Sequence, residues 1–440
     1  MKKIKVNIPI YDVKSGILDV KLSEDFGSTA KVSIDFKTLL PFANLVNKQV
    51  LDFFVLTCSV YGIDRFVNRK HNSVDGWSRE LHVRFPVSDL KIWNDIKIDL
   101  QELLSFLTGD YWSVDFYKSS FTNPEFDLPI EFTENYKQIN LFSGGLDSLI
   151  GSIDFLTTHS TDKLLLASHY DPQMKGPKSD QEDLLKKLNE QYRDLFDSVP
   201  SIKVTLAETT EKRETTFRSR SILFIGIALL ISQGKKITEI IVPENGSVSL
   251  NYPLSPSRRT SCSTRTTHAF VLDKVNLILS KLEVNSKITN PYEFMTKGEM
   301  VANCKDLNFL KKVIGISNSC GKRGHRRTWT NRGATHCGVC MPCIYRQASL
   351  LNQNDSTSYG SHINSLIPFK TKKTQDVGIC LDFLNKPLSK DEIKIELIIN
   401  GIKNIEKLDK YIDVIWRTRI ELSNWIKKNG NNIIKSKAGV

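Results

Sequence analysis

The sequence INLFSGGLDSLIGSIDFL, at residues 139–156, carries the clearest indication of the fold of this 440-residue chain. Ile139–Phe142 is short and mainly apolar, as in a buried strand, whereas the leucines and isoleucines from Leu146 to Leu156 recur with helical spacing. Between them lies the glycine loop SGGLDS, Ser143–Ser148. A strand, a glycine turn and a helix in direct succession predict the first unit of an α/β fold.

The same alternation continues from Lys137 to about Leu350. Further strands are expected at Leu164–Ala167, Ile202–Leu206 and Ile237–Val242, and helices over Leu184–Phe196, capped by Ser179 or Asp180, and Ser219–Ser232. Strands that alternate with helices predict a parallel sheet with helices on both faces. Such sheets bind ligands at the carboxyl ends of their strands, where the glycine loop lies.

The flanking regions have other patterns. Residues 1–120 mix β-like alternation with a helical stretch and predict an accessory α+β domain, and residues 363–440 predict a C-terminal helical region whose basic tail, 427–440, is frayed. Linkers are expected at Ser119–Pro129 and Asn352–His362, which leaves 137–350 as the central domain.

Composition limits the class of protein. Hydrophobic residues make up 40% and charged residues 25%, and the net charge of +12 fits an anionic ligand or partner. The start has no apolar signal region, and the longest apolar run, Ile222–Ile231, is far shorter than the ~20 residues of a membrane span. Eight cysteines are too few for a disulfide framework. We expect a cytoplasmic protein without membrane contact.

The glycine loop has the parts of a phosphate site. Gly144 and Gly145 let consecutive N–H groups point into one concavity at the start of a helix, and Ser143 and Ser148 offer hydroxyl donors. Asp147 fits such a site if it binds Mg²⁺ or if it fixes the loop by accepting backbone hydrogen bonds. The absence of a lysine after the glycines excludes the GxxxxGK[ST] loop.

A cysteine cluster predicts a metal centre. Cys337, Cys340 and Cys343 form C-x2-C-x2-C, and Cys320 precedes them. Four thiolates satisfy tetrahedral Zn²⁺ without an open position, which predicts a structural zinc site; an iron–sulfur cluster is the alternative. His336 is surplus to this set and is expected to support a ligand or face solvent.

The loop between Cys320 and Cys337 is strongly basic. It combines Lys322, Arg323, His325, Arg326, Arg327 and Arg332 with Trp329. Basic residues interleaved with an aromatic ring fit a nucleic acid backbone or an acidic protein, and a solvated surface loop explains them equally well.

The loop SGGLDS resembles the SGGxDS signature of the PP-loop ATP pyrophosphatases, which have the HUP-like adenine nucleotide alpha hydrolase fold. The resemblance implies that Phe142–Ser148, namely Phe142, Ser143, Gly144, Gly145, Leu146, Asp147 and Ser148, bind ATP with Mg²⁺. ATP is cleaved between its α and β phosphates and an acceptor oxygen is adenylated. The loop would stabilise the pyrophosphate leaving group.

The loop and the cysteine quartet together resemble the 7-cyano-7-deazaguanine synthase (QueC-like) family over about Lys137–Leu350. TKGE at Thr296–Glu299 looks like that family's T-K-x-E segment, and Arg220 and Arg346 are similar to family arginines. The resemblance implies a ligase that forms a C–N bond, with ATP, Mg²⁺, Zn²⁺ and a 7-carboxy-7-deazaguanine-like substrate. It places Arg220, Lys297 and Glu299 near the catalytic and substrate site.

The chain departs from that family in several features, among them SHYDPQMKG at 168–176 after the second strand. It is about twice as long, its first two cysteines are twice as far apart, and PENGSVSLNYPLSPSRR at 243–259 replaces a segment that holds the deazaguanine. The enlarged form resembles the QueC-like component of bacterial antiphage defence operons, the QatC family. That resemblance implies protein partners, an acceptor amine on one of them and terminal regions that dock them.

Two other functions fit parts of the sequence. A tRNA-modifying PP-loop enzyme of the thiolase type explains the positive charge and predicts a redox-active cysteine pair with salt-sensitive tRNA binding. A zinc-dependent binding module with an inactive PP-loop is the other, although intact Ser143, Asp147 and Ser148 argue against decay.

Overall fold

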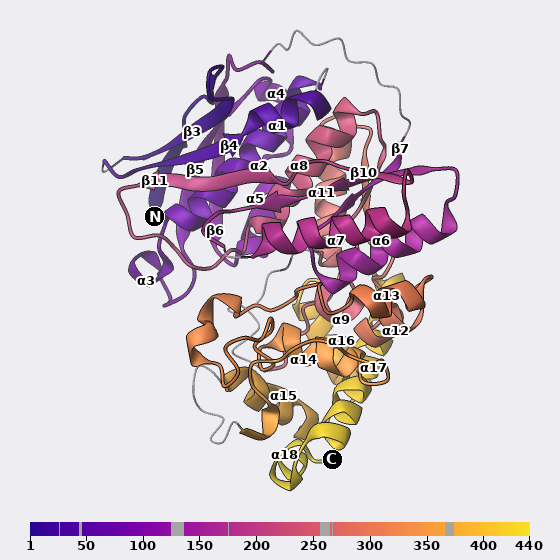
Figure 1. Ribbon diagram of the computed structural model, residues 1–440. Helices are drawn as coiled ribbons and strands as arrows, with labels where there is room; N and C mark the ends of the chain where they lie inside the picture. The colour runs from indigo at the N-terminus through magenta and orange to yellow at the C-terminus, as the bar shows by residue number, and fades with distance from the viewer. Residues whose placement is uncertain are drawn as a thin grey trace.

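The fold was obtained as a computed structural model of the whole chain (Figure 1). The structure describes residues 1–25, 27–43, 46–124, 136–174, 176–255, 265, 267–365 and 374–440. Part of the predicted linker Ser119–Pro129, the end of the segment 243–259 and the residues between 365 and 374 lie outside these ranges.

The central sheet grows from the strand before the glycine loop. It has five parallel strands in the order β10-β8-β7-β12-β13. Their bounds are β7 Tyr136–Leu141, β8 Lys163–Ala167, β10 Phe196–Ser198, β12 Glu239–Ile241 and β13 Lys287–Thr289. The prediction of a parallel sheet is confirmed. Because β7 is central, its carboxyl end delivers the glycine loop to the middle of one sheet edge.

Helices cover both faces of this sheet, as predicted. Helices α6 (Leu146–Thr158) and α7 (Pro177–Gln191) share one core with Leu164 and Leu166 of β8, whereas α8 (Arg220–Gly234) and α11 (Ala269–Lys281) share another with Leu165. Alternate residues of β8 therefore face opposite layers, as a strand buried on both sides requires.

A second sheet of eight strands lies beside the first, in the order β6-β5-β1-β3-β4-β11-β9, with β2 paired to β3. Its strands are β1 Lys2–Val6, β2 Ile10–Asp12, β3 Ile17–Glu24, β4 Thr29–Asp35, β5 Glu80–Val87, β6 Tyr111–Lys118, β9 His169–Tyr170 and β11 Ile202–Thr209. We expected a strand at Ile202–Leu206 in the central parallel sheet; the strand forms, but it pairs antiparallel with β4. The segment 137–350 thus supplies two strands, β9 and β11, to this eight-stranded sheet, which we call the N-terminal sheet.

Helix α2 (Lys48–Phe66) separates the two sheets. All of its residues from Val50 to Phe66 are buried, because the helix packs on the N-terminal sheet on one side and on α8 on another. The remaining N-terminal helices are α1 Phe36–Leu39, η1 Leu40–Phe42, α3 Arg69–Asn72, α4 Leu90–Asp95 and α5 Lys97–Thr108. One continuous apolar core runs from the N-terminal sheet through α2 and α8 to β7.

The rest of the chain forms a mainly helical part below the sheets (Figure 1). It contains α9 Gly246–Ser249, α12 Lys297–Ala302, α13 Leu307–Val313, η2 Arg323–Thr328, α14 Met341–Ser349, η3 Ile363–Ser365, α15 Gln375–Asn385, α16 Lys390–Ile399, α17 Ile405–Asn429 and α18 Asn432–Ala438. The expected frayed tail is wrong: α18 buries Ile434 and Ala438 against α15 and α17. In the described residues, no helix has both the length and the apolar character needed to cross a bilayer.

Two local predictions need correction. Helix α7 begins at Pro177 after Gly176, ahead of the predicted caps Ser179 and Asp180, because proline suits the first helical position. The helix also ends at Gln191, so Phe196 lies in strand β10. The side chain of Phe196 is buried, and the spacing of apolar residues alone does not distinguish the end of a helix from a short strand that follows it.

Candidate active site at the glycine loop and the cysteine cluster

The glycine loop links β7 to α6 through a turn that glycine makes accessible. Gly144 has φ +82°, a conformation that other residues rarely adopt, and Gly145 is the N-cap of α6. The Ser148 hydroxyl donates to the Gly145 carbonyl oxygen (3.0 Å) and lies 3.2 Å from the Ser143 hydroxyl. The loop therefore presents backbone N–H groups and two hydroxyls at the positive end of a helix, as a phosphate site requires.

Two serine hydroxyls accept hydrogen bonds from the loop amides. Gly145 N donates to Ser143 Oγ (3.3 Å) and Leu146 N donates to Ser319 Oγ (3.4 Å). Asn318 N donates to the Gly144 carbonyl oxygen (2.9 Å). Both long N–H bonds are weak enough for an anion to replace them. The sequence did not single out Asn318 and Ser319, which precede the first cysteine of the quartet.

Asp147 lies between an amide and an ammonium group. Its Oδ1 forms an ion pair with Lys297 Nζ, and its Oδ2 accepts from Asn245 Nδ2 (2.6 Å). The side chain of Asp147 is 12% exposed and that of Lys297 5%. Each carboxylate oxygen keeps a second lone pair, so the donor set fits a shared Mg²⁺ as well.

Glu244 adds a second carboxyl group that the sequence reasoning missed. It follows β12 at the same sheet edge, and Thr267 Oγ1 donates to its Oε2. Burial and the negative charge of Asp147 raise the pKa of Glu244 to about 7. Its position directly after a central strand was a usable signal, because polar residues at that edge face the ligand.

The segment TKGE delivers one of its two predicted residues to the loop. Thr296 caps α12 and forms a capping box with Glu299, which leaves Lys297 at the first helical position, turned toward Asp147. The carboxylate of Glu299 is engaged instead by Thr296 N (2.8 Å) and by Arg417 of α17 (2.6 Å). Lys297 is thus placed at the loop, and Glu299 supports the helix that carries it.

Arg220 begins α8 beside residues of the N-terminal region. Its guanidinium lies 5.2 Å from the ring of Phe224, and burial lowers its pKa, opposed by the charges of Tyr61 and Asp171. Asp171 accepts from Tyr61 Oη (2.6 Å) and pairs with Arg65 (3.4 Å), both on α2. The region around Arg220 is therefore built by two parts of the chain that are far apart in sequence.

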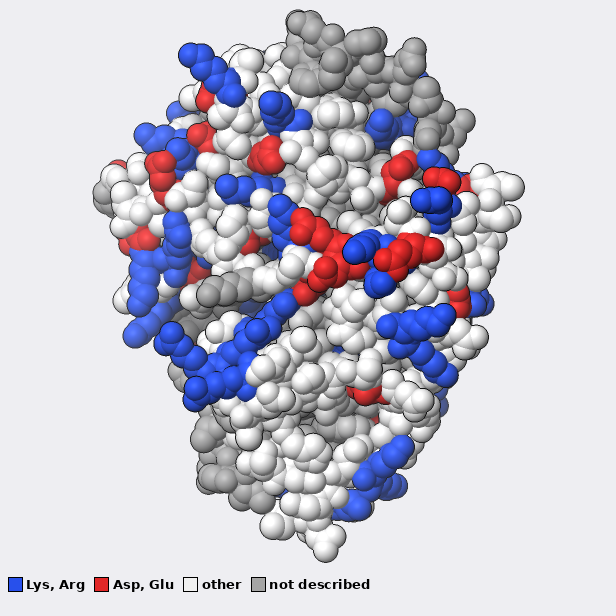
Figure 2. All heavy atoms as spheres, in the orientation of Figure 1, with Lys and Arg blue, Asp and Glu red and all other residues white. Residues whose placement is uncertain are grey.

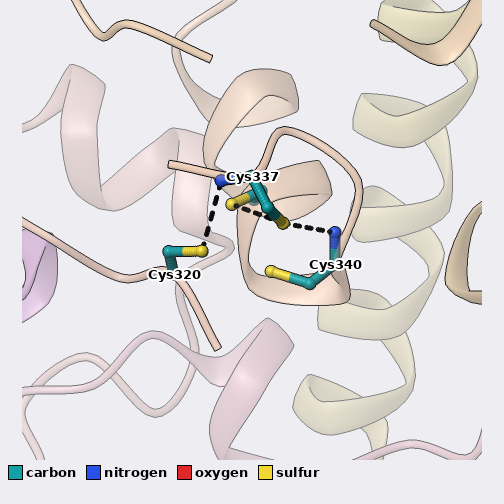
Figure 3. Close-up of side chains that lie close together, drawn as sticks. Cys320, Cys337 and Cys340 are labelled. Atoms are coloured by element: carbon teal, nitrogen blue, oxygen red, sulfur yellow. Dashed lines mark hydrogen bonds between the residues drawn. The ribbon is translucent and has the colours of Figure 1, made fainter. Parts of the chain in front are cut away.

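The four cysteines converge as the spacing predicted. All the sulfurs of Cys320, Cys337, Cys340 and Cys343 lie within 4.8 Å of one another, and those of Cys337 and Cys343 are 3.8 Å apart. Figure 3 shows Cys320, Cys337 and Cys340 close together. Tetrahedral zinc with Zn–S bonds of about 2.3 Å needs sulfurs roughly 3.8 Å apart, so the donor set fits Zn²⁺. Hydrogen bonds from Cys337, Cys340 and Cys343 lower the pKa of Cys320. The cluster could hold zinc as a structural cross-link.

His336 and Arg346 connect this cluster to the glycine loop. His336 is buried, and its Nε2 accepts from Ser319 N (3.4 Å), so the side chain does not face solvent. Arg346 is also buried and donates to the Ile314 carbonyl oxygen (2.6 Å) and to Ser317 Oγ (3.0 Å). These contacts hold the segment that contains Ser319, and the Ser319 hydroxyl in turn accepts from Leu146 N.

The basic loop contributes a charged surface. Figure 2 shows Lys and Arg gathered on the lower left of the molecule, over the segment left of α14 in Figure 1. His325, Arg326, Arg327 and Arg332 are exposed, whereas Lys322 pairs with Asp376 and Arg323 with Asp180. Trp329 is 5% exposed and therefore does not offer a free face for stacking on a base.

Comparison with known proteins identifies the central segment. Residues 137–354, just under half of the chain, match the family model described as "Queuosine biosynthesis protein QueC". None of the curated proteins and none of the solved structures compared matches the chain. The match includes the glycine loop, Arg220, Lys297 and the four cysteines. The chain therefore contains a QueC domain, whose family implies ATP-dependent chemistry like that of 7-cyano-7-deazaguanine synthesis.

Proposed function

We propose that the protein is an ATP-dependent ligase that adenylates the carboxylate of a 7-carboxy-7-deazaguanine-like substrate and then joins the activated carbon to a nitrogen nucleophile. The observation that carries the proposal is the grouping of Lys297 and Asn245 on Asp147, at the mouth of the loop Ser143–Ser148. A loop that no longer binds ATP would not require a buried lysine from α12 at this position.

The first step is nucleophilic substitution at the α-phosphorus of ATP. A carboxylate oxygen of the substrate forms the new P–O bond, and the bond to the β-phosphate oxygen breaks with its electron pair, releasing pyrophosphate. The loop amides, the hydroxyls of Ser143 and Ser148 and the ammonium of Lys297 would stabilise the charge that develops on pyrophosphate. Mg²⁺ bound by Asp147 would add positive charge there.

In the second step the nitrogen nucleophile attacks the acyl carbon, AMP leaves and the nitrogen loses a proton. With ammonia the product is an amide, which a second ATP-driven dehydration would convert to a nitrile. Zn²⁺, where bound, would hold the segment that carries Ser319 against the loop. We place the zinc in a structural role because four thiolates leave no open position.

A further part of the proposal concerns the nitrogen nucleophile that receives the activated carbon. We propose a role in bacterial antiphage defence in which an amine of a partner protein replaces ammonia. The altered segment after Val242 and the exposed basic surface around Arg326 and Arg327 support it. The domain boundaries 1–120, 137–350 and 363–440 and a cytoplasmic location belong to the same proposal.

A mass-spectrometric assay tests the reaction. The protein is incubated with ATP, MgCl2 and 7-carboxy-7-deazaguanine, with ammonium or with a candidate partner protein, and pyrophosphate release is followed in parallel. We expect pyrophosphate and AMP only when the deazaguanine is present, and loss of both in Asp147→Ala. Free nitrile as the sole product in every mixture would reject ligation to protein, and absence of pyrophosphate in all mixtures would reject the enzyme.

The cysteine arrangement bears on the tRNA-thiolase alternative. That function predicts a redox-active cysteine pair. Within the part of the chain that the structure describes, the four clustered cysteines instead form one set that could hold a metal ion, and Cys58 and Cys304 are buried in two other parts of the core. Trp329, the aromatic residue of the basic loop, is buried as well. Both observations favour the ligase.

A further inference from the structure

Helix α17, in the C-terminal region outside the QueC match, touches the two helix starts that supply the partners of Asp147. Asn245 is the N-cap of α9, and Lys297 is the first residue of α12. Both short helices are tied to one another as well, since Gly246 N donates to the Met295 carbonyl oxygen (2.7 Å). A single helix therefore adjoins both groups that hold Asp147.

The contacts with the α9 start are buried and polar. Thr418 of α17 and Ser247 of α9 share a hydrogen bond of 2.6 Å, and both side chains are buried. Ser247 Oγ also accepts from Lys297 N (3.3 Å). One chain of hydrogen bonds thus runs from α17 through Ser247 to the backbone of the lysine.

The contacts with the α12 start engage its free backbone N–H groups. Glu421 accepts from Gly298 N (3.2 Å) and from the Thr296 hydroxyl. The first amides of a helix have no partner within it, so a carboxylate at this end is favoured by hydrogen bonding and by the helix dipole. A Cβ at position 298 would collide with the Glu421 carboxylate, so the glycine of TKGE permits this close approach.

Arg417 fixes the same segment from one turn away. It pairs with Glu299 (2.6 Å) and donates to the Phe294 carbonyl oxygen (2.9 Å). Residues 294–299 are therefore held by two positions of α17, Arg417 and Glu421, which lie four residues apart on one helix face. In contrast, Arg419 points to a different neighbour and donates to the Leu384 carbonyl oxygen (2.8 Å).

We propose that α17 is a positioning element of the ATP site, in which Thr418 and Glu421 hold the starts of α9 and α12 so that Asn245 and Lys297 meet Asp147. The inference rests on the proposed function, because ATP is the ligand of that site. In this inference the C-terminal region positions residues of the ATP site. Displacement of α17 would weaken ATP binding through Lys297 and Asn245, without a contact of its own to the nucleotide.

A double-mutant cycle separates positioning from general stabilisation. ATP affinity in MgCl2 is measured by calorimetry for Glu421→Ala, Thr418→Val and Lys297→Ala, and for each α17 variant combined with Lys297→Ala. We expect each α17 substitution to weaken binding about tenfold alone and to add less than threefold in the Lys297→Ala background, because coupled residues are not additive. Glu421→Gln should retain most of the affinity, and Arg419→Ala, the control on the same helix, should bind as wild type.

Equal losses in both backgrounds, or no loss, would overturn the inference. Hydrogen exchange of residues 296–302 gives a readout without nucleotide: we expect faster exchange in Glu421→Ala but not in Arg419→Ala, and unchanged exchange would also overturn it. A wild-type protein that binds no ATP would instead reject the proposed function. The exchange experiment would still decide whether α17 holds this segment.

Discussion

The N-terminal and C-terminal regions are attached to the QueC domain by different kinds of contact. The N-terminal region shares a sheet through β4 and β11 and buries whole charged groups, such as Asp64, against the start of α8. The C-terminal region instead places one face of α17 on the starts of α9 and α12. We infer that loss of the first attachment affects mainly the stability of the fold, whereas loss of the second affects mainly the geometry at Asp147.

Removal of the metal should have the largest effect on stability. It should unfold the part of the chain around the cysteine cluster and leave the N-terminal sheet folded. Binding of structural zinc is worth on the order of 10 kcal/mol in small domains, so its loss should unfold the segment around Cys320–Cys343. We expect hydrogen exchange to rise there and in α14 after chelation, whereas β1 and β5 of the N-terminal sheet keep their protection. Metal analysis should give one zinc per chain.

The matched control is Cys304→Ser, which alters a buried cysteine outside the cluster and should leave the zinc content unchanged. Iron with acid-labile sulfide would show an iron–sulfur cluster instead. Uniform loss of protection across the chain would contradict the separation of the two regions.

Loss of Asp64 should destabilise the N-terminal attachment. Asp64 is buried and accepts from Arg79 Nη2 (2.7 Å), Ser219 N (3.1 Å) and Ser219 Oγ (3.0 Å). Burial opposes its ionisation, but the charges of Arg79 and Arg69 lower the pKa of Asp64 below its ordinary value. Asp64→Ala leaves these arginines short of a partner, and we expect a loss of about 3–5 kcal/mol in the free energy of unfolding, measured in urea.

ATP affinity of the folded Asp64→Ala protein should stay within about threefold of wild type. Asp110→Ala is the control for loss of an ion pair alone. Asp110 pairs with the same two arginines as Asp64, but it does not contact α8. A change of ATP affinity as large as that of Lys297→Ala would show that the two attachments do not differ in the way we infer.

Lys297 should matter for ATP and little for folding. Lys297→Met removes the ammonium that pairs with Asp147, and we expect ATP binding to weaken about 100-fold, which corresponds to about 2.7 kcal/mol. Calorimetric titration measures the affinity, and thermal unfolding should shift by only a few degrees. Lys305→Met, on an exposed lysine just after α12, serves as the control. Undiminished binding in Lys297→Met would remove the main support for the proposed site.

His268 should give the N-terminal attachment a pH dependence. It caps α11 by accepting from Phe270 N (3.2 Å), and its ring lies 5.0 Å from that of Phe106 on α5. Burial and the charge of Arg265 lower the pKa of His268 to about 3. The unfolded chain therefore binds a proton below its ordinary pKa of about 6.5 while the folded chain does not, so stability present above that pH is lost as the pH falls.

By pH 5 this loss should reach about 2 kcal/mol, measured as the change in urea-unfolding free energy from pH 7.5. His268→Asn retains a capping oxygen and removes the titration, so its stability should fall less over the same interval. An identical fall in both proteins would assign the acid sensitivity to other groups.

The central elements and both motifs were predictable because their signals are local. The run from Ile139 to Leu156 contains strand, turn and helix signals of its own. The C-x2-C-x2-C spacing keeps three cysteines close in sequence, so their sulfurs can meet. Strand Ile202–Leu206 was predicted as a strand but in the wrong sheet, because its apolar alternation does not distinguish β4 from β8 as a neighbour. The buried α18 was missed because its lysines and asparagines outweigh two buried side chains.

The sequence alone predicts a glycine loop of the phosphate-binding type at the end of a strand and four cysteines spaced to share one metal ion. The groups that surround Asp147 could be found only from the packing of the folded chain. Lys297 and Asn245 lie 150 and 98 positions away in sequence, and Thr418 and Glu421 act from a helix in another region. Contacts between such distant residues leave no periodic or spacing signal, since they depend on how whole helices pack against one another.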